Sequence, residues 1–427
     1  MNYKKFIPCI YLLKGNAVRS FRDSTVINMN PSELAKFYSD NHADEIIVFD
    51  LSTDDLDHEE AICMIKHICI MSEVPIIGAG NVNRMEDIKK LIYAGCKKAV
   101  LNFSRQDNIK LTQEVSKKFG KEKIIAAISD IATFKQYQDI IQEYISEVLL
   151  VNENNLKEFI KVGNIPMISM IPEVSLDKMM EYLNFPSISG ITGEIINSNA
   201  KEINSLKHLC SENGITVHNF DNATKWSEFK LNSDGMIPVI VQDYITSDVL
   251  MVAYMNEEAY QQTLKSGKMT YYSRSREELW LKGDTSGHYQ YVKSLTADCD
   301  MDTILAKVSQ VGAACHTGSY SCFFNEIVKK EYEETNPLKV FESVFAVIKD
   351  RKIHPKDGSY TNYLFDKGID KILKKLGEEA TEIVIASKNP NSDEIKYEIS
   401  DFLYHMMVLM VEKGVSWEEI TTELANR

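Results

Sequence analysis

The chain has 427 residues, of which 44% are hydrophobic and 26% are charged, a composition that predicts a globular protein of about two to four domains. The formal net charge of -14 argues against nucleic acid or an anionic membrane surface as the main partner. We expect no membrane span, because no run of about 18 apolar residues occurs. Eight cysteines in a chain of this length do not indicate a disulfide framework, and a reducing cytoplasm is the expected location.

Residues 1–222 alternate short apolar runs with amphipathic stretches of helical spacing. Eight such units predict a parallel (β/α)8 barrel. The segment GAGNVNRMEDIKKLIYAGCKKAVLN resembles the histidine-biosynthesis barrels, which are the phosphoribosyl-formimino isomerase and the cyclase subunit of imidazole glycerol phosphate synthase. The apolar runs are IPCIYLL, EIIVFDL, PIIGAG, KAVLN, IIAAIS, EVLLVN, PMISM and SISGITG.

The barrel departs from that family at the positions that carry its chemistry. The resemblance implies catalytic aspartates at the ends of the first and fifth strands, where this chain has Tyr11 and Ser129. Because Tyr and Ser do not exchange protons as carboxylates do at neutral pH, we expect a barrel without isomerase or cyclase activity. Asp130 and a phosphate site at Gly78 and Gly80 keep an active barrel open as an alternative, and tight turns explain these glycines equally well.

Residues 228–330 have a β-rich pattern with one short helix, which predicts an α+β domain. The stretch SRSREELWLKGDTSGH brings basic groups, hydroxyls and glycines together, as a phosphate-binding loop requires. For SRSR alone, a polar hairpin is the alternative interpretation. The candidate phosphate-binding residues are Arg274, Arg276, Lys282, Thr285 and Ser286.

The stretch TADCDMDT carries three aspartates spaced two apart, Asp298, Asp300 and Asp302. On a strand they would project from one face, because side chains alternate. Three adjacent carboxylates repel one another unless a cation lies between them, and oxygen ligands suit Mg²⁺. The sequence therefore predicts a magnesium site here, with a solvated acidic turn as the alternative.

Three cysteines lie in the same region among polar residues, and they are Cys299, Cys315 and Cys322. Three thiolates form a soft ligand set that selects Zn²⁺. A site with three protein ligands leaves a fourth position for water, whose pKa the metal lowers to about 7. Buried cysteines without a metal are the alternative interpretation.

Together these motifs resemble phosphoribosyl-AMP cyclohydrolase over about residues 230–327. The resemblance implies hydrolysis of the N1–C6 bond of the purine, with Zn²⁺ on the cysteines and Mg²⁺ on the aspartates. It also implies a homodimer whose zinc sites take cysteines from both subunits, and assigns the five candidate phosphate-binding residues to the phosphoribosyl groups. We expect His316 to move the proton, with His288 as the second candidate; orienting a zinc ligand is the alternative role of His316.

Residues 336–427 predict a small all-α bundle. Two helical stretches carry acids spaced three apart, Glu379 with Glu382 and Glu398 with Asp401, so each pair shares a helix face. Acids beside a core are costly unless a metal neutralises them, and we expect a second Mg²⁺ site. A solvated face is the alternative for either pair alone. The expected core residues are Ile383, Ile385, Ile399, Phe402, Leu403 and Met406.

KKLGEEATEIVIA and EISDFLYHMM resemble phosphoribosyl-ATP pyrophosphohydrolase over about residues 338–425. The resemblance implies Mg²⁺-dependent release of pyrophosphate by a dimer. It assigns Glu378 as a catalytic carboxylate, and Lys375 and His405 as substrate-binding residues.

The two resemblances imply consecutive steps of histidine biosynthesis by one bifunctional, cytoplasmic enzyme. The helical domain would produce phosphoribosyl-AMP and the central domain would open its ring. Three alternatives stay open: a metal-dependent hydrolase of other purine nucleotides, additional isomerase activity in the barrel, and a binding protein without enzymatic activity.

Overall fold

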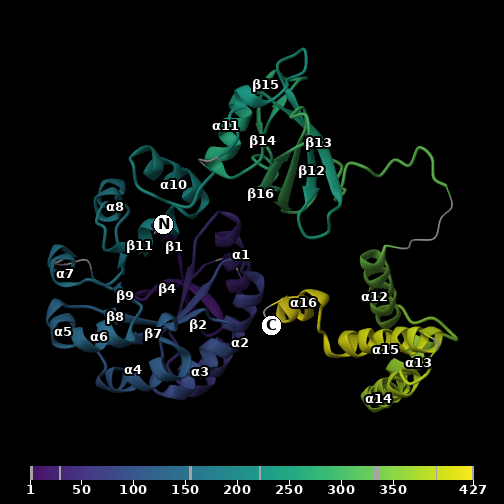
Figure 1. Cartoon of the computed structure of the whole chain (residues 1–427), viewed down its shortest axis with the longest axis horizontal. Helices are drawn as coiled ribbons and strands as arrows, with labels where there is room; N and C mark the ends of the chain where they lie inside the picture. Colours follow the sequence, from purple (N-terminus) through teal and green to yellow (C-terminus); the bar gives the residue numbers. More distant parts are fainter. Residues whose placement is uncertain are drawn as a thin grey trace. The chain divides into compact units, whose positions relative to one another are not determined.

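A computed structural model describes residues 3–27, 30–152, 156–220, 223–330, 336–390 and 392–425. The chain divides into two compact units, Met1–Asn325 and Glu326–Arg427 (Figure 1). Among the described residues, no helix is both long and apolar enough for a membrane span. This division does not test the predicted domain limits 1–222, 228–330 and 336–427, which stay predictions.

A closed parallel barrel forms the first part of the larger unit. Strand β1 pairs with β11 and β2 pairs with β5, and only Pro8 separates β1 from β2. The parallel sheet therefore closes on itself, with eight strands when β1 and β2 count as one. The strands are β1 (Lys5–Ile7), β2 (Cys9–Leu13), β5 (Ile46–Asp50), β6 (Ile76–Ala79), β7 (Lys98–Asn102), β8 (Ile124–Ile128), β9 (Glu147–Leu150), β10 (Met167–Met170) and β11 (Ile188–Thr192).

Helices follow the barrel strands in the order that the sequence predicts, and each predicted apolar run forms a strand. The antiparallel hairpin of β3 (Asn16–Ser20) and β4 (Asp23–Val26) extends from β2. The predicted (β/α)8 barrel is thus confirmed. The helices are α1 (Pro31–Asp40), α2 (Asp55–Met71), α3 (Met85–Tyr93), α4 (Gln106–Phe119), α5 (Ile131–Gln136), α6 (Gln138–Tyr144), α7 (Leu156–Val162), α8 (Leu176–Leu183), α9 (Glu194–Ser198) and α10 (Ile203–Glu212), with short 3-10 helices η1 (Lys121–Lys123) and η2 (Ala200–Glu202).

The inside of the barrel is apolar at the carboxyl ends of its first strands. Tyr11, Phe21 and Phe49 pack together there, with ring centroids 4.7–5.4 Å apart. At the opposite ends of the strands, Glu147 is buried and contacts both Lys5 and Lys98. This buried charge cluster therefore lies away from the end where enzymes of this fold carry their active sites.

The second part of the larger unit is an α+β domain. Its four-stranded sheet has the order β13-β12-β17-β16, and β14 and β15 form a separate hairpin. Inward residues of β12 alternate with half-buried ones, as expected for a strand with one face on the core. Its elements are η3 (Trp226–Glu228), β12 (Ile237–Asp243), β13 (Val249–Met255), α11 (Glu257–Ser266), β14 (Thr270–Ser273), β15 (Glu278–Leu281), β16 (Gln290–Ala297) and β17 (Ile304–Gln310).

The smaller unit is all-helical, as predicted. Its fully buried apolar core is small, and its members are Ile348, Leu364, Ile372, Met407 and Val408. The expectation that Ile385 and Ile399 line this core is wrong, because they are 59% and 41% exposed; the other four expected core residues are partly buried. The helices are α12 (Pro337–Ile353), α13 (Tyr360–Lys367), α14 (Ile369–Ala386), α15 (Ser392–Lys413) and α16 (Trp417–Ala425).

Candidate active sites

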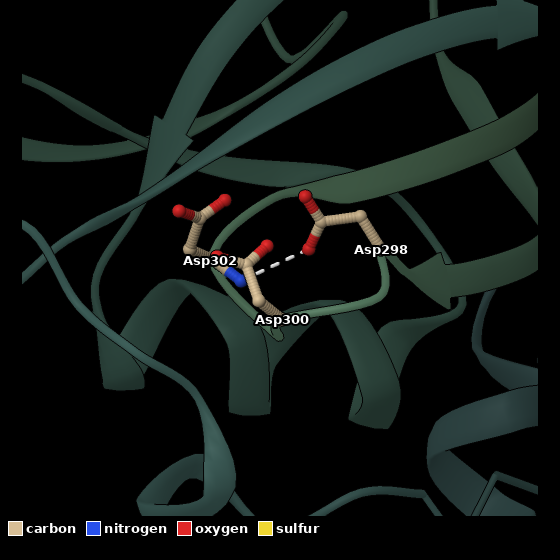
Figure 2. A group of neighbouring side chains, drawn as sticks. All are labelled: Asp298, Asp300 and Asp302. Carbon is tan, nitrogen blue, oxygen red and sulfur yellow. Dashed lines mark hydrogen bonds between the residues drawn. The ribbon is translucent and has the colours of Figure 1, made fainter.

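The three aspartates of the α+β domain lie on a turn between β16 and β17. The strand does not continue through them: the chain reverses direction, and Met301 has φ 63°. The carboxylate of Asp298 closes this turn by accepting from the backbone N–H groups of Asp302 (3.0 Å) and Thr303 (3.1 Å). The turn brings oxygens of Asp298, Asp300 and Asp302 within 4.8 Å of one another, and the three carboxylates lie around it in Figure 2.

A lysine that sequence reasoning missed lies beside these carboxylates. The Nζ of Lys230 is 3.1 Å from an oxygen of Asp300 and 3.8 Å from one of Asp302. Its hydrogen bond to Asp300 raises the pKa of Lys230. Desolvation opposes ionisation of Asp298, but the backbone N–H groups of Asp302 and Thr303 hold its pKa below the ordinary value. The cluster is therefore anionic and partly balanced by one cation.

The three cysteines do not form a single site within one chain. Cys315 and Cys322 are near each other, whereas Cys299 is exposed on the aspartate turn, and the three sulfurs do not all lie within 4.8 Å. The Thr317 hydroxyl donates to the sulfur of Cys315 at 3.1 Å and lowers its pKa. Partial desolvation and the neighbouring Cys315 raise the pKa of Cys322. One chain thus supplies two of the three predicted sulfur ligands at one place.

The buried side chain of Lys282 is electrostatically coupled to these two sulfurs. Burial lowers the pKa of Lys282, and the sulfurs of Cys322 and Cys315 oppose this effect when they are ionised. The predicted catalytic His316 is exposed, with Nδ1 4.0 Å from the sulfur of Cys315. The ring of His288 packs against Gly312, where an added Cβ would approach it to 2.7 Å. His316 is therefore the histidine that lies directly beside a candidate zinc ligand.

The predicted phosphate-binding residues lie on the β14–β15 hairpin and the loop that follows it. Arg274 places its guanidinium 3.9 Å from the centre of the Tyr254 ring, a cation–π contact. Arg276 is exposed and paired with Glu278 at 3.1 Å. Thr285 and Ser286, in the following loop, are exposed. These groups are available to a ligand, and Arg274 is the one whose orientation an aromatic ring supports.

Facing helices α14 and α15 carry the acidic cluster of the helical unit. Oxygens of Glu379, Glu382 and Glu398 lie within 4.8 Å of one another, and Glu379 is 4% exposed. Desolvation, followed by a hydrogen bond and charge repulsion from Glu382, raises the pKa of Glu398. The fourth predicted ligand, Asp401, does not belong to this group. Three carboxylates thus share a space that suits a divalent cation.

Cationic and aromatic side chains surround this cluster. The Nζ of Lys375 is 3.1 Å from Glu378 and 3.5 Å from Glu379, and its hydrogen bond lowers the pKa of Glu378. His405 donates from Nδ1 to the backbone carbonyl of Asp401 at 2.8 Å, which leaves Nε2 to accept from the Tyr360 hydroxyl at 3.1 Å.

Sequence reasoning missed Tyr360, whose position depends on α13 packing beside α15. The hydroxyl fixes the ring of a buried histidine whose Nδ1 is 3.7 Å from Glu379. It therefore orients a group that contacts the acidic cluster.

The barrel positions singled out in the sequence have structural explanations. Tyr11 is buried in the aromatic cluster, and Asp130 caps α5 by accepting from the Thr133 N–H at 2.8 Å. Gly80 has φ +82°, and an added Cβ would lie 2.2 Å from the backbone oxygen of Asp50. At Gly78 a Cβ would approach Leu91 to 2.8 Å. The backbone therefore requires glycine at position 80, and tight side-chain packing favours glycine at position 78.

Three family models match separate parts of the chain. The model described as Phosphoribosyl-AMP cyclohydrolase matches residues 251–324. The model described as Phosphoribosyl-ATP pyrophosphohydrolase matches residues 341–427. The model described as Histidine biosynthesis protein matches residues 5–162 of the barrel. The aspartate turn and the glutamate cluster fall within the two hydrolase matches.

Curated relatives match the chain over nearly their whole length. "Histidine biosynthesis bifunctional protein HisIE" of Thermoanaerobacter pseudethanolicus is 54% identical over 209 residues, which is 46% of this chain and 97% of the relative. The proteins of the same name from Caldanaerobacter subterraneus and Bacillus subtilis are 53% and 46% identical, covering 47% of this chain and 96% and 95% of each relative. The chain belongs to the bifunctional HisIE family of histidine biosynthesis, and it is a hydrolase of phosphoribosyl-AMP and phosphoribosyl-ATP that carries an N-terminal histidine-biosynthesis barrel in addition.

Proposed function

We propose that the two reactions occur at two metal sites built from the clusters described above. Phosphoribosyl-ATP is hydrolysed to phosphoribosyl-AMP and pyrophosphate in the helical unit, and the purine ring of phosphoribosyl-AMP is opened in the α+β domain. One observation carries this assignment: each hydrolase match contains one group of three carboxylates close enough to share a cation.

In the helical unit, Glu379, Glu382 and Glu398 would hold Mg²⁺. Desolvation, together with the hydrogen bond and charge of Glu382, raises the pKa of Glu398, and a bound cation would offset this effect. Bound Mg²⁺ supplies charge neutralisation and orientation for a phosphoryl transfer. Lys375 adds a positive charge for the phosphate chain, and Glu378 beside it is the candidate for orienting the attacking water. Asp401 stays a predicted fourth ligand.

In the α+β domain, Asp298, Asp300 and Asp302 would hold Mg²⁺, and Zn²⁺ would bind Cys315 and Cys322 of one copy with Cys299 of a second. The lowered pKa of Cys315 favours the thiolate that a metal requires, and Cys299 is exposed to a partner. Bound Zn²⁺ supplies a water of lowered pKa. This ligand set makes a homodimer part of the proposal.

The remaining groups of that domain bind substrate and move a proton. Arg274, Arg276, Lys282, Thr285 and Ser286 would contact the phosphoribosyl groups. His316, adjacent to Cys315, would accept and return the proton, with His288 as the second candidate. One domain then carries all three sets of side chains, for metal, phosphate and proton.

The proposal is tested with the full chain and phosphoribosyl-ATP in the presence of Mg²⁺. A zinc-selective chelator should stall the reaction at phosphoribosyl-AMP, and added Zn²⁺ should restore ring opening. Complete ring opening by metal-analysed, zinc-free protein would refute the zinc site. Competition with ATP separates the alternative of a general purine-nucleotide hydrolase: equal turnover of ATP would favour it over the biosynthetic substrate.

The barrel is proposed to lack isomerase activity. Its two predicted acid–base positions hold Tyr11, buried among aromatic rings, and Ser129, which is partly buried beside the helix-capping Asp130. Turnover of the formimino isomerase substrate by the full chain would overturn this part of the proposal.

A further inference from the structure

Two carboxylates of the barrel hold one lysine of the cyclohydrolase domain. The Nζ of Lys293, on β16, is 3.1 Å from an oxygen of Asp40, the last residue of α1, and also contacts the carboxylate of Glu73 in the loop after α2. The Asp40 side chain is 3% exposed and that of Lys293 is 19% exposed. An ion pair with so little solvent around it is fixed in position more strongly than an exposed one.

Lys293 occupies a special place in its strand. In the pairing of β16 with β17, Val292 lies opposite Val308 and Ser294 lies opposite Lys307, so Lys293 has no partner residue. It is the extra residue of a β-bulge, which bends the strand and sets the register of every pair beyond it. Slippage by one residue would turn each following side chain to the other face.

The register fixed at this bulge extends directly to the aspartate turn. The last pair of β16 and β17 is Ala297 with Ile304, and the turn begins at Asp298. The backbone N–H of Asp298 donates to the carbonyl of Thr303 at 3.0 Å. The position of the bulge therefore decides which residues form the turn.

The same two carboxylates support the neighbouring strands. Lys36 bridges the second oxygen of Asp40 (3.0 Å) and the hydroxyl of Ser309 on β17 (3.1 Å). Glu73 also accepts from the hydroxyl of Tyr244, directly after β12. The contacts reach three adjacent strands, β12, β17 and β16, from the barrel side.

We propose that the barrel is a positioning domain for the cyclohydrolase: Asp40 and Glu73 clamp the bulge at Lys293 and thereby fix the register of the strand that ends in the aspartate turn. The consequence for catalysis rests on the proposed metal-binding role of that turn. The consequence for strand register does not, and the two are measured separately.

The first measurement is hydrogen–deuterium exchange on the full chain. In the variant Asp40→Asn/Glu73→Gln (the seam variant), peptides covering residues 290–303 should exchange faster, while the exchange of peptides from α14 and α15 stays unchanged. The matched control is Glu86→Gln/Asp107→Asn, which removes one Glu and one Asp charge from exposed barrel pairs with Lys89 and Lys110. Unchanged exchange over 290–303 in the seam variant would overturn the proposal.

The second measurement is kinetic. In the seam variant kcat/KM for phosphoribosyl-AMP should fall between about 10- and 100-fold, the effect of a displacement of about 1 Å at a catalytic group, and the Mg²⁺ concentration for half-maximal rate should rise. Pyrophosphohydrolase activity of the same protein is the internal control and should not change. Lys293→Arg should keep both activities, whereas Lys293→Met should reproduce the seam variant; circular dichroism verifies that each protein is folded.

The outcomes separate the two proposals. Faster exchange over 290–303 with no rise in the Mg²⁺ requirement would uphold the clamp and count against the metal role of the turn. A wild-type Mg²⁺ requirement together with wild-type exchange in the seam variant would refute the clamp and leave the metal site intact.

Discussion

The ion pairs at the amino-terminal ends of the barrel strands give the most direct test of what holds the barrel together. Glu147 is 4% exposed and lies 3.0 Å from the Nζ of Lys5 and 2.9 Å from that of Lys98. Desolvation acts to raise its pKa, but the two lysine charges outweigh this effect and hold the pKa of Glu147 below its ordinary value. The carboxylate is therefore ionised and central to the network.

The variant Glu147→Gln removes the negative charge and keeps the shape. The two ammonium groups then share only Glu45, at 3.1 and 3.8 Å. Breaking a buried pair costs about 3–5 kcal/mol, and we expect the lower end, about 3 kcal/mol, because both lysines are about one-fifth exposed. The corresponding shift in melting temperature is about 6–12 °C for a domain of this size.

Urea unfolding at pH 7.5, followed by circular dichroism, measures this change. A carboxyl whose pKa is depressed by folding stabilises the folded state at pH values above its unfolded pKa of about 4.3, and this stabilisation is lost as pH falls through the folded pKa. It is therefore fully present at pH 7.5. Adding Lys98→Met to the variant should recover part of the loss, because Lys5 then keeps Glu45. The control is Glu173→Gln, which removes a carboxylate that pairs with Lys178 and is itself 58% exposed. A loss no larger than in the control would refute this account of the network.

Two further predictions concern the metal sites. Cys315→Ser should lower the rate of ring opening at least about 100-fold, the upper range for altering the surroundings of a metal, while pyrophosphate release stays at the wild-type rate. The control Cys63→Ser changes an exposed cysteine of the barrel and should leave both rates unchanged. Equal loss of ring opening in both variants would contradict the prediction. Because desolvation, followed by a hydrogen bond and repulsion from Glu382, raises the pKa of Glu398, its ionisation destabilises the helical unit as pH rises through that pKa, and Mg²⁺ should offset this. Mg²⁺ should therefore raise the melting temperature more at pH 7.5 than at pH 4.5, and Glu379→Gln should abolish the difference; an equal Mg²⁺ effect at both pH values would count against the site.

The sequence predicts the barrel well because its signals are local and repeated. Each apolar run contains β-branched residues, as does Ile124–Ile128, whose five residues are all buried, and helical spacing follows each run. The glutamate cluster was also predictable, because spacing of three places Glu379 and Glu382 on one face. Local periodicity thus accounts for these elements.

The remaining features depend on contacts between residues that are distant in the chain. The alternation in TADCDMDT imitates a strand, but Asp298 satisfies two backbone donors and closes a turn. Lys230 and Tyr360 reach their sites only through tertiary packing, and no spacing in the sequence indicates them. Ile385 and Ile399 have the helical spacing of core residues, yet their own unit leaves them exposed.

The uncovered apolar residues of the helical unit have a practical consequence. The exposed side chains of Ile385, Ile399 and Leu424 can lose their contact with water only if another molecule covers them. If that molecule is a second copy of the chain, mass action makes the stability of the helical unit depend on protein concentration. Assays at nanomolar and at micromolar enzyme need not observe the same species, so specific activity is best reported as a dilution series.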